Sequence, residues 1–520
     1  MSDSRDYNRT DRPSSPTGVA NQAAISRLLE HAESLNVRFL NLEFTDVVGL
    51  AKCVTIPVEQ LADCLANGKW FDGSAIEGFA RVAETDMFLR PDPATFAVVP
   101  WRAGIAASDG AGGETARMIC DVLMPTGERF EGDPRAVLQS ALEEAAAQGY
   151  RYIVSPELEF FLLHEADDEA PEPLLHDRGG YFDLSTDPAA DVRREICAEL
   201  ARMGIGIESS HHEVAAGQHE LDFISDDALH IADAVVTARY TIKAVAQRHG
   251  LMATFLPKPF YGVNGSGMHT HQVLVRIEDG SNAFADPSNA GYGLSLLGQR
   301  FIAGQLDHAP AICAVVAPLV NSYKRLVPGY EAPVMISWGR VNREALVRVP
   351  RATPGQPESL RVELRSPDPS CNPYLAFATM LRAGLDGVAR DLTLAPPVEE
   401  GLYTLEESAR LRKGIAVLPR RWARRYLRWR MMTWCGWRLD RWWPPGSTRR
   451  RRRSGWSIAA RCIRGSWSAI SRYFDYSLDK PRKSHLAKPV PRPNWGYGER
   501  LSTHFCQAIC AACKTARSWD

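Results

Sequence analysis

The pattern of apolar and polar positions divides most of the chain into alternating helices and strands. Residues 22–41 carry apolar side chains at helical spacing and lead into a strand. Residues 37–57 predict two strands around a turn at Asp46–Gly49. In GDPRAVLQSALEEAAAQGY, Asp133 is a candidate N-cap and Pro134 a candidate first residue of a new helix. Strands and helices mix after this helix, so we expect an α+β protein.

Composition and patterning predict four stretches. We expect residues 1–20 to form a disordered leader, residues 21–125 a small α+β domain, residues 126–419 a larger α+β domain and residues 420–520 a distinct tail. The leader is polar and lacks the apolar core of a signal peptide, and no run of about 18 apolar residues predicts a transmembrane helix. Eleven cysteines without a secretory context are typical of reduced thiols, which favours a cytoplasmic protein.

The tail differs from the body in charge. Residues 1–419 carry 37 Lys or Arg and 57 Asp or Glu, whereas residues 420–520 carry 24 and 5, and ten of the thirteen tryptophans. An Arg- and Trp-rich arm could bind nucleic acid or an anionic membrane. We favour a reading-frame error, because a one-base shift in a GC-rich gene turns Leu and Glu codons into Trp and Arg codons. We therefore expect no nucleic-acid and no membrane partner, and the nucleotide sequence around codon 420 separates the two hypotheses.

Acidic residues recur at strand spacing in two segments. In YRYIVSPELEFFLL, a strand would place Glu157 and Glu159 on one face. In IESSHHEVAAGQHELDF, a two-residue turn at Ala216–Gly217 would put Glu213 directly opposite Glu220. Like charges this close repel unless a cation lies between them, and hard cations such as Mg²⁺ or Mn²⁺ prefer oxygen ligands. The alternatives are a surface strand and a chance acidic hairpin.

A glycine-rich turn runs into two histidines in VNGSGMHTHQV. In a strand, His269 and His271 would share a face, which suits one metal ligand and one phosphate partner. The glycines before them would let the backbone approach a ligand closely. The turn is not a Walker A loop, because no Gly-Lys-Ser/Thr follows, and it is not a Rossmann fingerprint, because a strand follows.

Arginines and a further carboxylate complete the candidate chemistry. Arg361, Glu363 and Arg365 alternate in SLRVELRSP and would share one strand face. The segments before this strand carry more charged side chains: Arg325, Glu331, Arg340, Arg343 and Arg348. A carboxylate between guanidiniums suits a metal beside an anionic substrate. From the residues alone, five carboxylates with His269 and several arginines indicate a two-metal, ATP-using ligase or kinase.

In this order, these segments resemble the type I (bacterial) glutamine synthetase family from about residue 20 to about residue 419. The motifs include FTDVVG, FDGSAIEGFARVAETDM, SHHEVAAGQHELD, KPFYGVNGSGMHTHQ, NSYKRLVPGYEAP and RVELRSPDPSCNPYLAFA. The resemblance implies an N-terminal β-grasp domain followed by a catalytic α+β domain. It also implies a homododecamer of two stacked hexameric rings with active sites between neighbouring subunits, an assembly that the altered tail is expected to impair.

The resemblance implies two divalent-cation sites per subunit, for Mg²⁺ or Mn²⁺, with ATP as co-substrate. The ligands of one cation would be Glu159, Glu213 and Glu220, and those of the other Glu157, His269 and Glu363. Residues expected to bind glutamate or line the ammonium site are Asn264, Gly265, Arg325 and Tyr181. Residues expected to face the ATP phosphates or the transferred phosphate are His271, Arg343, Arg348 and Arg365. Asp46, donated by the adjacent subunit, and Glu331, on a flap, would bind and deprotonate ammonium.

The expected reaction is ATP-dependent ligation of ammonia to the γ-carboxylate of L-glutamate through γ-glutamyl phosphate, giving L-glutamine, ADP and phosphate. The nearest alternative is a γ-glutamyl-amine ligase acting on a polyamine or ethanolamine. Asn264, Asp46 and Glu331 favour ammonium, because a bulkier amine would need a more open pocket. A remoter alternative is a non-catalytic protein whose basic tail binds nucleic acid.

The chain departs from the family pattern at several positions. Val273 stands where a small polar residue is usual. Val341 and Glu344 replace an Arg and a Ser beside the phosphate site, which puts ATP affinity in question more than reaction type. Tyr403 lies where some family members are adenylylated, but its flanking residues differ.

Overall fold

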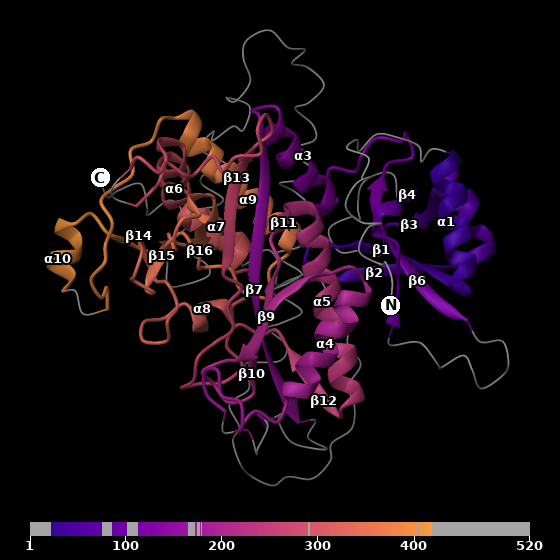
Figure 1. Ribbon diagram of the computed structural model, residues 1–520, viewed down its shortest axis with the longest axis horizontal. Coiled ribbons are helices and arrows are strands. Elements are labelled where there is room, and N and C mark those ends of the chain that lie inside the picture. The colour runs from indigo at the N-terminus through magenta and orange to yellow at the C-terminus, as the bar shows by residue number, and fades with distance from the viewer. Residues whose placement is uncertain are drawn as a thin grey trace, which may run out of the picture. The chain divides into compact units, whose positions relative to one another are not determined.

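The computed structural model (Figure 1) describes residues 22–74, 86–100, 113–164, 172–173, 177, 179–289, 292–403 and 406–418. The predicted leader and the Arg- and Trp-rich tail both lie outside these residues. Within them, no helix is long and apolar enough to cross a membrane.

In the described residues, the N-terminal domain has a six-stranded sheet and two α-helices. Its elements are α1 (Gln22–Ser34), β1 (Val37–Thr45), β2 (Ala51–Pro57), α2 (Leu61–Asn67), β3 (Lys69–Asp72), β4 (Asp86–Pro91), β5 (Ala97–Val98) and β6 (Glu114–Leu123). The strand order is β2-β1-β6-β4-β3, with β5 beside β6. The predicted strand pair around Asp46–Gly49 is confirmed as antiparallel β1 and β2. Ile25 of α1 and Leu61 of α2 share a buried apolar cluster with Leu40 and Met118 of the sheet.

The larger domain contains an 11-stranded sheet. Its strands are β7 (Tyr150–His164), β8 (Glu172–Pro173), β9 (Ile207–His212), β10 (Gln218–Phe223), β11 (Asp226–Asp227), β12 (Leu251–Thr254), β13 (Thr270–Arg276), β14 (Met335–Gly339), β15 (Ala345–Arg348), β16 (Val362–Leu364) and β17 (Ala416–Val417). The main path is β17-β14-β15-β16-β13-β7-β10-β9. Its helices are α3 (Pro134–Ala146), α4 (Ala190–Arg202), α5 (Ala228–Arg248), α6 (Leu296–Asp307), α7 (Ala309–Val316), α8 (Ser322–Arg325), α9 (Pro373–Ala389) and α10 (Glu407–Arg412). The expected α+β architecture is confirmed.

Strand β7 organises this domain, and in Figure 1 it runs beside β13. Alternate residues of β7 point to opposite faces of the sheet. Tyr152, Leu158 and Phe160 are buried in the apolar cluster to which residues of α3 and α5 also belong. The intervening positions, Glu157 and Glu159, therefore face away from that cluster, which places both carboxylates on the other side of the sheet.

Helix α3 begins as predicted and joins the two domains. Asp133 is the N-cap, and its side chain accepts a hydrogen bond from the backbone N–H of Arg135. The buried Arg135 guanidinium contacts carboxylates from three segments: Asp92 at 2.7 Å, Asp121 at 2.5 Å and Asp233 at 3.1 Å. Because Asp92 and Asp121 belong to the N-terminal domain and Asp233 to α5, this cluster links both domains through one buried cation.

Candidate active site

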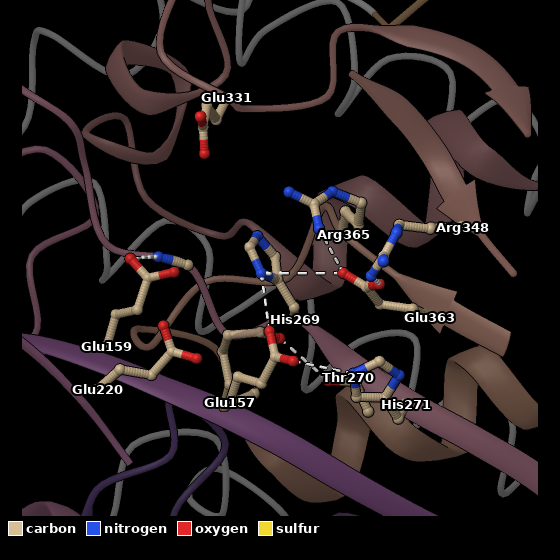
Figure 2. Close-up of polar contacts among 12 residues, drawn as sticks. Glu157, Glu159, Glu220, His269, Thr270, His271, Glu331, Arg348, Glu363 and Arg365 are labelled. Atoms are coloured by element: carbon tan, nitrogen blue, oxygen red, sulfur yellow. Dashed lines mark hydrogen bonds and ion pairs between the residues drawn. The ribbon is translucent and has the colours of Figure 1, made fainter. Parts of the chain in front are cut away.

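Three neighbouring strands bring the first group of predicted ligands together. In the paired strands, His271 of β13 lies opposite Glu363 of β16, and Glu157 lies on the adjacent β7. His269 precedes β13, and its Nδ1 lies 3.1 Å from Glu157 and 4.0 Å from Glu363. Figure 2 shows the His269 ring between these two carboxylates. The possible ligand atoms of Glu157, His269 and Glu363 all lie within 4.8 Å of one another.

The second group of predicted ligands forms where β10 pairs with β7. Glu220 lies directly opposite Glu159, and Figure 2 shows both beside Glu157. Glu213 follows β9, and His211 lies 3.7 Å from Glu213 and 3.8 Å from Glu220. The structure therefore places all the predicted ligands of this group around one face of the sheet.

The predicted register of the β9–β10 hairpin is wrong. Glu220 pairs with His211, not with Glu213. The backbone N–H of Glu213 donates to the carbonyl of Gln218 at 2.8 Å, so these two residues close the turn and residues 214–217 form it. The turn is therefore two residues longer than predicted, and its last residue, Gly217, has φ 71°.

Sequence reasoning missed two polar residues of β10. The Nε2 of Gln218 donates to Glu159 at 2.8 Å and to the carbonyl of Gly265 at 3.2 Å, so it joins a predicted metal ligand to the glycine-rich loop. Asp222 lies opposite Glu157 and within 4.8 Å of Glu157 and Glu220. Gln218, Glu220 and Asp222 alternate along β10 and so share one face of the strand, and this spacing could have identified the two missed residues.

The carboxylates have contrasting protonation behaviour. Burial, together with the charge of Glu213, raises the pKa of Glu159 to about 8, and burial beside Glu159 holds the pKa of Glu220 well above its usual range. Burial alone would also raise the pKa of Glu157, but hydrogen bonds from two histidines lower it well below its usual value. Although Glu363 is buried, the charge of Arg365 lowers its pKa to about 2. The charge of Arg325 also acts on Glu159, but it does not outweigh burial and the charge of Glu213.

A buried group of carboxylates with this excess of negative charge fits a divalent cation. The donor set is almost entirely carboxylate oxygen with one imidazole, which suits Mg²⁺ or Mn²⁺ better than the softer thiolate-binding metals. Two adjacent ionised carboxylates in a buried site would repel one another unless they were protonated or shared a cation.

The glycine-rich loop packs closely against Pro257, Arg325 and Glu159. A Cβ on Gly265 would lie 2.2 Å from the carbonyl oxygen of Pro257. A Cβ on Gly267 would lie 2.5 Å from Arg325 and 3.1 Å from Glu159. Asn264 is half-buried beside Gly265. Larger residues at the two glycines would push the loop away from the carboxylates.

The buried arginines of the candidate site hold its backbone and its ligands. Arg325 donates to the carbonyls of Arg365, Ser366 and Pro367 at 3.1–3.2 Å. Arg365 forms an ion pair with Glu363, and Arg348 donates to the same carboxylate at 2.8 Å. Arg348, predicted to face ATP, therefore contacts a predicted metal ligand in this structure.

The predicted flap residue Glu331 lies above the carboxylates in Figure 2. Its nearest basic neighbour is the predicted phosphate-facing residue Arg343, 4.0 Å away, and both side chains are more than half exposed. Ala332, the next residue, accepts a hydrogen bond from the Tyr403 hydroxyl. The backbone N–H of Tyr403 donates to Glu344 at 2.9 Å. Tyr403 therefore connects the flap to Glu344, the residue after Arg343 that departs from the family pattern.

Aromatic rings border the carboxylates on another side. Tyr181 stacks on Phe182 with ring centroids 3.9 Å apart, and both rings contact the edge of His211. Burial and the charges of Glu213 and Glu220 raise the pKa of Tyr181 to about 12. The predicted site residue Tyr181 therefore lies beside the metal-ligand candidates.

Asp46 lies apart from this site in the same chain. It is buried in the β1–β2 turn, where its side chain contacts Lys52 at 3.2 Å and accepts from the backbone of Val48 and Leu50. Asn372 donates to its backbone carbonyl at 3.1 Å. These contacts involve none of the predicted ligands.

Comparisons with known proteins identify the same two domains. A family model described as "Glutamine synthetase, beta-Grasp domain" matches residues 36–125, and one described as "Glutamine synthetase, catalytic domain" matches residues 131–430. The glutamine synthetase of Halobacterium salinarum is 51% identical over 393 residues, which cover 75% of this chain and 84% of that protein. The glutamine synthetase of Thermus thermophilus is 47% identical over 396 residues, covering 76% and 86%. A solved GmaS–ADP complex has a TM-score of 0.71 and 29% identity, covering 87% of this chain and 97% of that chain.

Proposed function

The chain belongs to the glutamine synthetase family and is a glutamate–ammonia ligase, and we propose how its residues share this reaction. The observation that carries the proposal is that five carboxylates and His269 converge on one face of the sheet, where β16, β13, β7 and β10 lie side by side. Glutamate's γ-carboxylate is a poor electrophile, so the reaction first needs its phosphorylation by ATP.

Two cation positions follow from the two ligand groups. We assign one to Glu159, Glu213 and Glu220 and the other to Glu157, His269 and Glu363. When bound there, Mg²⁺ or Mn²⁺ would supply positive charge to offset the negative charge of the ATP phosphates and of the transferred phosphoryl group.

The side chains of the chain would orient the other reactants. Glutamate would be held by Asn264 and Gly265 of the glycine-rich loop beside Glu159, and by Arg325 at the end of α8, which packs against that loop. Arg365, held by its ion pair with Glu363, would face the transferred phosphate. His271, Arg343 and Arg348 are assigned to the ATP phosphates.

The amine acceptor is assigned as ammonium. Ammonium must lose a proton before it attacks, and the carboxylates of Glu331 and of Asp46 can take part in that step. Tyr181 would line the same site. The relatives at 46–51% identity, over 84–87% of their lengths, are named glutamine synthetase, which favours ammonia over a larger amine.

The proposed site is completed by a second subunit. Asp46 contacts Lys52 in its own chain and none of the predicted ligands. A homo-oligomer in which the β1–β2 turn of one subunit reaches the carboxylate groups of the next would bring it there, as in the dodecamer expected for the family.

The test is amine-dependent product formation by the full-length protein with glutamate, ATP and Mg²⁺. We expect glutamine and phosphate with ammonium, and little product with ethanolamine or putrescine. We expect His269→Ala to abolish synthesis, whereas the same change at the surface residue His249 should not. Efficient ligation of putrescine without glutamine formation would replace ammonium by a polyamine, and full activity of His269→Ala would overturn the ligand assignment.

A further inference from the structure

A buried carboxylate, Asp177, contacts His212, the residue before the predicted ligand Glu213. Its side chain is fully inaccessible to solvent. Oδ1 accepts from the backbone N–H of Gly179 at 2.7 Å, and Oδ2 accepts from the backbone N–H of Gly217. Both oxygens lie 3.0–3.1 Å from Nε2 of His212. One carboxylate therefore joins three segments of the chain.

His212 extends this connection to a predicted ligand. Its Nδ1 lies 2.6 Å from the backbone carbonyl of Glu213, while its Nε2 faces Asp177. The imidazole ring therefore lies between two acceptors, one on Asp177 and one on the backbone of Glu213.

Each segment that meets Asp177 leads to a residue of the candidate site. Gly179 begins the loop that carries Tyr181. His212 precedes Glu213, and Gly217 ends the turn before Gln218, which bonds Glu159. The fit is close, because a Cβ on Gly179 would lie only 2.8 Å from Nε2 of His212.

A metal ion at this buried cluster is a weaker explanation. Asp177, His212 and His219 do have possible ligand atoms within 4.8 Å of one another. However, Arg193 lies 2.9 Å from Nδ1 of His219 and can only donate, so the hydrogen of the neutral ring is on Nε2. With a hydrogen on Nε2, His219 offers no lone pair to an ion there, and the nearby guanidinium repels a cation.

We propose that Asp177 and His212 form a positioning pair that fixes Glu213 and the turn before Gln218 and Glu220, and so shapes one divalent-cation site. The proposal rests on the proposed function for the identity of that site. The pair touches neither substrate nor the reacting atoms, and acts through the backbone of the segments it joins. Outer partners of this kind typically change metal affinity by about 10–100-fold when they are removed.

The test measures Mn²⁺ binding to the full-length protein by electron paramagnetic resonance, in the absence of glutamate, ATP and ammonium. Asp177 accepts hydrogen bonds from Gly179, Gly217 and His212. In Asp177→Asn, one carboxylate oxygen becomes an NH₂ group, which would place a donor against one of these donors. We expect this variant to bind one of two Mn²⁺ ions about 10–100-fold more weakly and the other normally.

A matched control is available in the same domain. Asp386 lies 2.6 Å from Nε2 of His308, a second buried histidine–carboxylate pair that joins α9 to the end of α6. We expect Asp386→Asn to leave both Mn²⁺ affinities unchanged, so a general loss of packing does not mimic the effect. Should Asp177→Asn fail to fold, His212→Gln keeps a donor to Asp177 but loses the bond to Glu213, and should also weaken one site.

Wild-type affinity at both sites in folded Asp177→Asn or His212→Gln protein would overturn the proposal, as would equal weakening of both sites. The outcome is separable from the proposed function. If the wild-type protein binds two Mn²⁺ ions but makes no glutamine, the reaction assignment fails while the positioning pair is still tested.

Discussion

At the residue scale, two non-glycine residues of the candidate site have left-handed backbone conformations. Glu331 has φ 55° and Phe182 has φ 65°. Such conformations cost of order 1–3 kcal/mol and persist where surrounding contacts hold them. Around Glu331, the bond from Tyr403 to Ala332 supplies such a contact. The strain falls on the flap and on the loop of Tyr181, two of the three segments assigned to the ammonium site.

Replacing Glu331 by Gln tests its proposed proton-accepting role. Gln keeps the size of the side chain but cannot take a proton from ammonium, so kcat should fall by about 10²–10⁴-fold. Mn²⁺ affinity should not change, because Glu331 belongs to neither ligand group. Steady-state kinetics and Mn²⁺ titration measure the two effects. The exposed Glu358→Gln serves as a control, and an unchanged kcat in Glu331→Gln would refute the role.

At the element scale, the alternation of β7 places Glu157 and Glu159 on one face, and this was readable from the sequence. The register of the β9–β10 hairpin was not. That register depends on a turn whose last residue, Gly217, donates its N–H to Asp177 forty positions earlier in the chain. A contact of that sequence separation leaves no mark in local periodicity.

The N-cap of α3 gives an element-scale prediction about pH. Burial and the charge of Asp121 raise the pKa of Asp133 to about 7 in the folded protein. In the unfolded chain its pKa is about 3.9, so between pH 4 and pH 7 the folded state binds the extra proton. The contribution of Asp133 to the unfolding free energy therefore falls by up to about 4 kcal/mol as pH rises through that window.

The comparison that isolates this effect is wild type against Asp133→Asn. Other groups titrate alike in both proteins, so the unfolding free energy of wild type should fall relative to the variant between pH 5 and pH 8. Urea unfolding at several pH values measures the difference. A difference that is constant with pH would show that Asp133 is ionised throughout.

At the scale of the whole molecule, buried charge connects the two domains. Arg135 is almost fully buried and contacts three carboxylates, two from the N-terminal domain and one from α5. Removing one partner from a buried ion pair leaves the others uncompensated, typically at a cost of about 3–5 kcal/mol.

We expect Arg135→Met to lower the unfolding free energy by about 3–5 kcal/mol, measured by urea denaturation. The control is Arg382→Met, which removes an ion pair to the half-exposed Glu144. Pairs with solvent access contribute about 0–1 kcal/mol, so that variant should be nearly as stable as wild type. Equal losses in both variants would argue against a special role for the buried cluster.

The proposed sharing of the site between subunits predicts complementation. Asp46→Asn and Glu331→Gln oligomers should each be nearly inactive. If Asp46 acts in the neighbouring subunit's site, mixed oligomers contain sites with both residues intact, and random mixing in equal amounts should restore about one quarter of wild-type activity. Activity measured after co-refolding or co-expression checks this. No recovery, in oligomers shown to be mixed, would place Asp46 outside the neighbour's site.

The sequence by itself determined the fold class, the two domains and the residue types of the site, because strand alternation and long motifs are local properties of the chain. It also indicated the family, and hence the ligand assignments. Only the tertiary structure decided which atoms meet. The pairing of Glu220 with His211 depends on the length of a turn, and the contact of Arg348 with Glu363 joins neighbouring strands. Asp177 meets His212 and Gly217 from 35 and 40 residues away. Such contacts depend on packing, turn length and burial in three dimensions, which no local pattern encodes.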